Sequence, residues 1–306
     1  MRARAVAAAC LGLALAAAPA VTPARTAEPA PIVDALGRRL VFARPPTRLV
    51  TIFASNTELV AALGLADHIV GIETFTRFPS EVIGRPMVGG RLGFSVDRVV
   101  RQRPDLVVVT PARQAVNQLV DPMERLGIPI VVLTHRSIPE VMANIRLVAA
   151  VTGVPDRGEA VTGALQARLD AVAARIAGKP RPRIVMITGR VATGMLLIAR
   201  PGSYTADAMV AAGGDLAFNR AQMLAQVAPE AILRADPDIV LFAGSATDMR
   251  DLFDRPGWAS LRALKEKRVF VVSRAEFLIP GPRVVAGIEK LALVLHPELS
   301  SPGSRP

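Results

Sequence analysis

Two stretches of this chain carry the same pattern of residue types. Residues 95–109 read SVDRVVRQRPDLVVV, and residues 228–242 read APEAILRADPDIVLF. In both, an acidic residue, an apolar pair, an arginine, a Pro-Asp dipeptide and an apolar run recur in register. A helix that ends before Pro-Asp and leads into a short apolar run is typical of one helix-to-strand step in an α/β layer. The repetition therefore predicts two similar lobes with a ligand cleft between them.

Strand and helix patterns alternate along the rest of the chain, which favours an α/β fold of two Rossmann-like lobes with mostly parallel sheets. Residues 158–178 keep apolar residues at helical spacing for about five turns, so one long, rigid helix is expected to join the lobes. Besides the two repeats, the expected strands lie at 48–53, 68–72, 129–133, 183–188 and 269–273, and the expected helices at 116–126, 204–212 and 283–295.

The first 20 residues have the pattern of an export signal. They combine a basic start, an apolar stretch over 5–18 that is too short to span a bilayer, and a small-residue cleavage signal ending at Ala20. We expect a periplasmic protein cleaved after about Ala20. The only cysteine, Cys10, lies in this segment, so the mature chain has no thiolate for a metal site or a nucleophile. The predicted organisation is a signal peptide at 1–20, a tether at 21–31, an N-terminal lobe at 32–156, a connecting helix at 157–179, a C-terminal lobe at 180–299 and a tail at 300–306.

Composition and motifs argue against nucleic-acid binding and catalysis. The formal net charge is +11, but the basic residues are scattered and form no basic run or aromatic RNA-binding signature. The chain has no G-x-S-x-G elbow, P-loop, dinucleotide glycine fingerprint or H-E-x-x-H motif. Its three histidines are His68 and His296, which we expect at the surface, and His135, which follows a strand on a loop expected at the cleft. Such scattered histidines cannot form a site for free zinc or manganese, so we predict no metal site and no resident cofactor.

Several motifs in order resemble a known family. SNTELVAALGL at 55–65, VGG at 88–90, the two Pro-Asp units, LGIPIVVL at 126–133, AGGDLAFN at 212–219 and PGPRVVAGIE at 280–289 resemble the helical-backbone substrate-binding proteins of ABC importers for ferric siderophores, haem and cobalamin. The resemblance covers roughly residues 32–297. It implies a monomeric periplasmic protein, without enzymatic activity, that delivers its ligand to the transmembrane subunits of an ABC permease.

The resemblance also assigns a role to the acidic residue of each repeat. In that family, an acidic residue near the start of the equivalent helix in each lobe docks onto arginines of the permease. Asp97 and Glu230 occupy these positions, although the family usually has glutamate in the first lobe. A simpler interpretation is that each acid stabilises the first turn of its helix by about 0.3–1 kcal/mol. Both roles can hold at once.

The ligand is less well defined by the sequence. Cobalamin-binding members stack the corrin on tryptophans in the loops before each repeat helix, where this chain has Arg91 and Leu224, and its only tryptophan, Trp258, lies elsewhere. Haem-binding members often place an axial tyrosine where this chain has Gly90, so haem would need another iron ligand such as Tyr204 or His135. Cobalamin and haem remain alternatives to a ferric siderophore.

An anionic ferric siderophore is the ligand we expect, because arginines are frequent on the loops predicted to face the cleft. Guanidinium groups bind pairs of carboxylate, catecholate or hydroxamate oxygens in a planar fork. Each arginine could equally be a solvated loop charge, Tyr204 could line the pocket or cap the core, and the phenylalanines could pack in the core. The predicted ligand contacts are Ser55, Asn56, Phe75, Arg77, Arg91, Phe94, Arg113, His135, Arg190, Tyr204, Arg220 and Arg274, with Phe78 and Phe277 as further candidates for apolar walls. Glu58 is expected to complete a helix capping box with Ser55.

Overall fold

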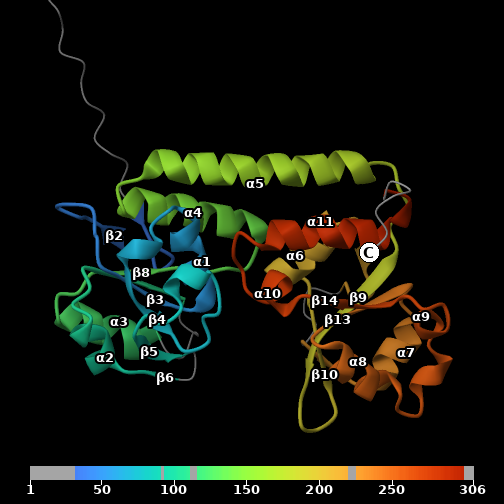
Figure 1. Ribbon diagram of the computed structural model, residues 1–306. Coiled ribbons are helices and arrows are strands. Elements are labelled where there is room, and N and C mark those ends of the chain that lie inside the picture. The colour runs from blue at the N-terminus through green and yellow to red at the C-terminus, as the bar shows by residue number, and fades with distance from the viewer. Residues whose placement is uncertain (1–31, 91–92, 111–115, 220–224, 300–306) are drawn as a thin grey trace, which may run out of the picture. The chain divides into compact units, whose positions relative to one another are not determined.

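The computed structural model describes residues 32–90, 93–110, 116–219 and 225–299 (Figure 1). The first lobe contains a six-stranded sheet in the order β6-β5-β4-β3-β7-β8, parallel except for the β5–β6 pair. A short antiparallel hairpin of β1 (Ile32–Val33) and β2 (Arg39–Leu40) precedes it. The strands are β3 (Leu49–Ile52), β4 (Ile69–Glu73), β5 (Met87–Gly90), β6 (Gly93–Phe94), β7 (Leu106–Val109) and β8 (Ile130–Val132), and the helices are α1 (Ala54–Ala62), α2 (Val96–Arg101), α3 (Val116–Arg125) and α4 (Ile138–Val151).

The second lobe has its own six-stranded sheet, ordered β12-β10-β9-β13-β14, with β11 also pairing with β9. β9, β11, β13 and β14 are parallel, whereas β10 and β12 are antiparallel to their neighbours. The strands are β9 (Arg183–Arg190), β10 (Leu196–Ile198), β11 (Asp215–Leu216), β12 (Gln226–Val227), β13 (Ile239–Ala243) and β14 (Val269–Val272), and the helices are α6 (Tyr204–Ala211), α7 (Pro229–Ala235), α8 (Ala246–Phe253), α9 (Arg262–Lys265), α10 (Arg274–Phe277) and α11 (Val284–Leu295). The predicted α/β class with two mostly parallel sheets is confirmed.

The repeated Pro-Asp has a structural reason in both lobes. Asp105 accepts hydrogen bonds from the backbone N–H groups of Thr47 (2.9 Å) and Arg48 (2.7 Å), immediately before β3. Asp238 does the same for the N–H of Arg183, the first residue of β9, at 2.7 Å. Burial opposes ionisation of Asp238, but hydrogen bonds from Arg262 and from this N–H hold the pKa of its carboxyl below the ordinary value. Each repeat therefore anchors the start of the neighbouring strand in its sheet.

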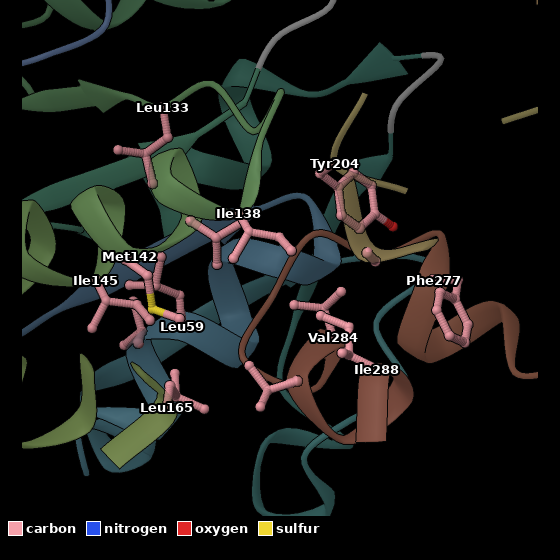
Figure 2. Packing of buried hydrophobic residues seen from close by; sticks show 14 of the residues in the cluster. Leu59, Leu133, Ile138, Met142, Ile145, Leu165, Tyr204, Phe277, Val284 and Ile288 are labelled. Atoms are coloured by element: carbon pink, nitrogen blue, oxygen red, sulfur yellow. The ribbon is translucent and has the colours of Figure 1, made fainter. Parts of the chain in front are cut away.

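A single hydrophobic core runs through both lobes and the helix that joins them, α5 (Pro155–Ile176). Figure 1 shows α5 lying along α4 of the first lobe and α11 of the second. In Figure 2, Leu59 and Ile145 from the first lobe belong to the same cluster as Ile288 from the second. Each sheet also has a smaller hydrophobic cluster on its other face, and each of these clusters contains residues of one lobe alone. Movement of one lobe against the other would therefore disturb a continuous core as well as a helix.

Two local predictions were wrong because tertiary contacts decide them. Glu58 is not a capping residue: α1 begins after Phe53 without a side-chain cap, and Glu58 is 3% exposed and paired with Arg283 of the second lobe. His296 is not at the surface: it is 3% exposed and packs against Gly213, whose missing side chain leaves room for the imidazole. His68 is half-buried.

Within the described ranges, no helix combines the length and the apolar character needed to cross a membrane.

Candidate functional site

The carboxyl ends of parallel strands are where open α/β sheets bind ligands, and both lobes place polar side chains there. In the first lobe, α1 follows directly after β3, and its N-terminal residues lie beside the loops that leave β7 and β8. Glu73 at the end of β4 accepts a hydrogen bond from the N–H of Ala54 at 3.0 Å, which holds the start of α1 in place. This edge of the first sheet is therefore built around α1.

A buried polar network connects α1 to these loops. The amide nitrogen of Asn56 donates to the carbonyl of Ile52 (2.7 Å), and its oxygen lies 3.2 Å from the Thr110 hydroxyl and 3.1 Å from Nε2 of His135. On the other side of the ring, the Asn144 amide nitrogen lies 3.1 Å from Nδ1 of His135. Both ring nitrogens are therefore used by a neutral imidazole that donates from Nε2.

Burial disfavours the charged form of His135 and lowers its pKa to about 4. His135 is 9% exposed, and Ser55 and Asn56 are fully buried. In this structure these three predicted contacts support the loops at the sheet edge and present little or no surface to a ligand. Their polar atoms are satisfied within the protein, which suits a rigid support for a binding site.

The second lobe has a pocket of about 810 Å³ at the carboxyl ends of β9, β13 and β14. Its lining combines apolar and polar residues. Arg190, at the end of β9, and Arg274, at the start of α10, both line it. Nη1 of Arg274 donates to the carbonyls of Thr188 and Ala243, each at 3.0 Å, which fixes this guanidinium at the junction of two strands. The further lining residues are Ile187, Gly189, Leu196, Phe242, Ala243, Gly244, Ser245, Asp248, Asp251, Leu252 and Ser273.

Of the first-lobe predictions that the structure describes, Arg77, Phe75 and Phe94 do not line this pocket. Arg77 is exposed, and its guanidinium folds back to donate to the carbonyls of Thr74 (2.8 Å) and Thr76 (2.9 Å). Phe75 is 61% exposed, whereas Phe94 is half-buried against the core of its own lobe. The predicted contacts Arg91, Arg113 and Arg220 lie outside the described residues, as does Leu224.

Tyr204 and Phe277 pack in the core that the lobes share (Figure 2). Tyr204 is 8% exposed, and its hydroxyl is buried without a hydrogen-bond partner in the described part of the chain. Burial raises the pKa of this hydroxyl above its ordinary value. Of the two roles that the sequence left open for Tyr204, core packing is the one seen in this structure. Phe78 instead lies under the guanidinium of Arg283, with 4.2 Å between the guanidinium carbon and the ring centre.

The two repeat acids, Asp97 and Glu230, are exposed in the first turns of α2 and α7. The N–H of Arg98 is already capped by Ser95. Among the described residues, neither carboxylate has a hydrogen bond or an ion pair, so both are free for another molecule. Each also has the favourable helix-dipole position expected from the sequence.

Sequence reasoning missed Asp248 and Asp251, which line the second-lobe pocket from α8. The sequence does contain a pattern that could have identified them. Ser245 and Asp248 form a Ser-x-x-Asp helix start directly after the apolar strand 239–243. A helix that starts directly after a parallel strand begins at the carboxyl edge of the sheet, where ligands bind. In the described ranges, no group of three or more His, Cys, Asp or Glu side chains is placed to hold a metal ion.

Comparisons with known proteins give the family. Residues 49–275 match the family described as periplasmic binding protein, and the chain belongs to that family. An uncharacterized ABC transporter substrate-binding lipoprotein, YvrC, of Bacillus subtilis is 26% identical over 285 residues, covering 88% of this chain and 86% of the relative. A vitamin B12-binding protein of Salmonella choleraesuis is 25% identical and covers 83% of this chain and 91% of its own. Among solved structures, a periplasmic heme binding protein from Pseudomonas aeruginosa is 26% identical with a TM-score of 0.72, covering 85% of this chain and 96% of that one.

The predicted resemblance is therefore confirmed at the level of the family. The chain is a substrate-binding protein and not an enzyme, and its fold is similar to that of a solved periplasmic binding protein.

Proposed function

We propose that this protein is the periplasmic substrate-binding component of an ABC importer for a metal-chelate compound, with a ferric siderophore as the first candidate ligand. A signal peptide cleaved after about Ala20 would export it. The mature protein would capture its ligand at the carboxyl edges of its two sheets and deliver it to the permease.

The observation that carries this proposal is the pair of arginines in the second-lobe pocket. Arg190 and Arg274 come from different elements and line one pocket of about 810 Å³. That volume suits a compact organic chelate, because ligand pockets in proteins commonly measure about 300–1,000 Å³. Guanidinium groups are permanently charged and bind oxygen pairs in a fork, which matches the oxygen-rich surface of a ferric siderophore.

Cobalamin and haem are the second candidates, because relatives of this chain are named for them. The Salmonella relative is a vitamin B12-binding protein and the similar Pseudomonas structure is a heme binding protein. A haem iron would have to be ligated by a group other than Tyr204 or His135, since the Tyr204 hydroxyl is buried in the core and both nitrogens of His135 are engaged. This makes haem the weaker of the two alternatives.

Asp97 and Glu230 would dock onto the permease. The support is that both carboxylates are exposed, occupy equivalent positions in the two lobes, and have no partner in the described residues. A carboxylate that serves only to stabilise its own helix has no need of an equivalent in the other lobe. A permease with two transmembrane subunits could bind both carboxylates at the same time, one with each subunit.

Uptake of a ferric siderophore by cells that carry the permease tests this function. Asp97→Arg combined with Glu230→Arg should reduce uptake by at least about tenfold, because each reversal places like charges at the docking site. Ligand affinity of the purified variant should stay within about twofold of the wild type. The matched control is Asp156→Arg, since Asp156 is also an exposed first-turn acid, in α5. Undiminished uptake would contradict docking and favour a sensor or scavenger without a permease.

A further inference from the structure

The second-lobe pocket carries opposite charges that do not neutralise each other. Arg190 and Arg274 line it from β9 and α10, and Asp248 and Asp251 line it from α8. Oppositely charged side chains that share a pocket ordinarily stabilise the fold by pairing. Here the ion pairs of the described residues include none between these arginines and these aspartates.

Most of the charged groups also remain available. Arg190 and Asp251 are exposed, and neither the Arg190 guanidinium nor the Asp251 carboxylate has a hydrogen-bond partner in the described ranges. Arg274 lines the pocket and uses Nη1 for two backbone carbonyls, and its Nε and Nη2 have no hydrogen-bond partner among the described residues. Asp248 receives the Ser245 hydroxyl at 2.7 Å through one oxygen, and its second oxygen is not used. The pocket therefore offers donors and acceptors of opposite charge at the same time.

The pocket lining also contains apolar residues and glycines. Ile187, Leu196, Phe242 and Leu252 are buried side chains that form part of the lining. Gly244 has no room for a side chain, since a Cβ there would lie 2.5 Å from the Phe242 ring. The missing side chain of Gly244 is therefore needed for the packing of Phe242, whose ring lies in the pocket lining. A ligand can contact apolar atoms of this lining while its polar groups meet the charged side chains.

We propose that the ligand presents both acceptor oxygens and a cationic nitrogen group to this pocket. The oxygens meet Arg190 and Arg274, and the nitrogen group meets Asp248 and Asp251. This inference rests on the proposed function and narrows it: the chelate is a compound with a free ammonium group. A uniformly anionic chelate, such as a ferric tricatecholate, would place negative charge against both aspartates, and like charges in contact are costly.

Two ferric chelates of opposite charge test the inference by isothermal titration calorimetry on the mature protein. A ferric trihydroxamate with a free ammonium group, ferrioxamine B, should bind at least about tenfold more tightly than the tricatecholate ferric enterobactin. Asp251→Asn should weaken the ammonium-bearing chelate by roughly tenfold and reduce the preference. Because Asp251 is exposed and unpartnered, this isosteric change leaves folding intact, which an unchanged Tm would verify.

The matched control is Asp254→Asn, in an exposed acid at the end of the same helix that does not line the pocket. It should leave both affinities unchanged, whereas Arg190→Gln should weaken both chelates. Equal or tighter binding of the tricatecholate, with a preference that Asp251→Asn does not alter, would overturn the inference and leave the proposed function standing. Failure of both chelates, haem and cobalamin to bind would overturn the two together.

Discussion

The ion pair between Glu58 and Arg283 should be a main polar connection between the lobes. Glu58 comes from α1 of the first lobe, and Arg283 precedes α11 of the second. The guanidinium donates to both carboxylate oxygens, at 2.9 and 2.5 Å, and lies over the ring of Phe78. The Glu58 side chain is 2% exposed and the Arg283 side chain 28% exposed. Removal of the arginine would therefore leave a buried carboxylate without its counterion.

We predict that Arg283→Met lowers the free energy of unfolding by about 3 kcal/mol at pH 8, the low end of the range for a broken buried pair. Burial already raises the pKa of Glu58, and Arg283 opposes that rise through hydrogen bonds and charge. Without Arg283 the pKa of Glu58 should rise further. A carboxyl with a higher pKa in the folded state than in the unfolded state takes up a proton on folding, so stability increases as the pH falls through the folded pKa. The loss should accordingly shrink to roughly 1–2 kcal/mol near pH 5.

Urea denaturation followed by far-UV circular dichroism at both pH values is the assay. Glu58→Gln and the double variant complete a double-mutant cycle that isolates the coupling between the two residues. The control is Arg168→Met, because Arg168 pairs with Glu289 at a site where both side chains are more than a third exposed, at 44% and 38%. That change should cost less than about 1 kcal/mol. Equal losses for the two arginine variants, or a loss that is independent of pH, would refute the reasoning.

Two further predictions concern single buried sites. The pKa of His135 is lowered by burial to about 4 from 6.5, so the unfolded chain binds the proton first as the pH falls, and up to about 3 kcal/mol of stability should disappear between pH 6.5 and pH 4. Denaturation curves of His135→Gln should lack this part of the pH dependence, and an identical pH profile would contradict it. Gly213→Ala should cost roughly 3 kcal/mol, because φ is +98° there and a Cβ would collide with His296. Gly194→Ala, at φ +85° with no atom within 4 Å, should cost only about 1 kcal/mol, and equal Tm shifts for the two variants would contradict the packing argument.

The fold was predictable because its signal is periodic and local. The sequence repeat at 95–109 and 228–242 predicts two helix-to-strand units. The structure adds the reason for the Pro-Asp dipeptide in each: Asp105 and Asp238 accept a hydrogen bond from a backbone N–H at the start of a neighbouring strand. That contact spans more than 50 residues of sequence in each lobe, so no local pattern could identify it. The wrong prediction for Glu58 has the same cause. Its position in the sequence matches a capping box, but its actual partner, Arg283, lies 225 residues away.

The candidate site was predictable only in part, for a related reason. The sequence identifies residues on loops that follow strands, and Arg190 and Arg274 do meet in one pocket. It does not show which side chains at a sheet edge face outward: Asn56 and His135, predicted as ligand contacts, are buried, whereas Asp248 and Asp251 line the pocket without having been predicted. Orientation at a strand end depends on the loop backbone and on packing against neighbouring helices, and neither has a periodic signature.

The measurement that tests the central claim most directly is native mass spectrometry of the mature protein with ferric siderophores, cyanocobalamin and haem. The proposed function predicts a one-to-one complex with one chelate class, weakened by Arg190→Gln and unchanged by Arg200→Gln, an exposed arginine outside the pocket. The absence of any chelate complex, or a complex that Arg190→Gln leaves untouched, would contradict the assignment of this pocket as the ligand site.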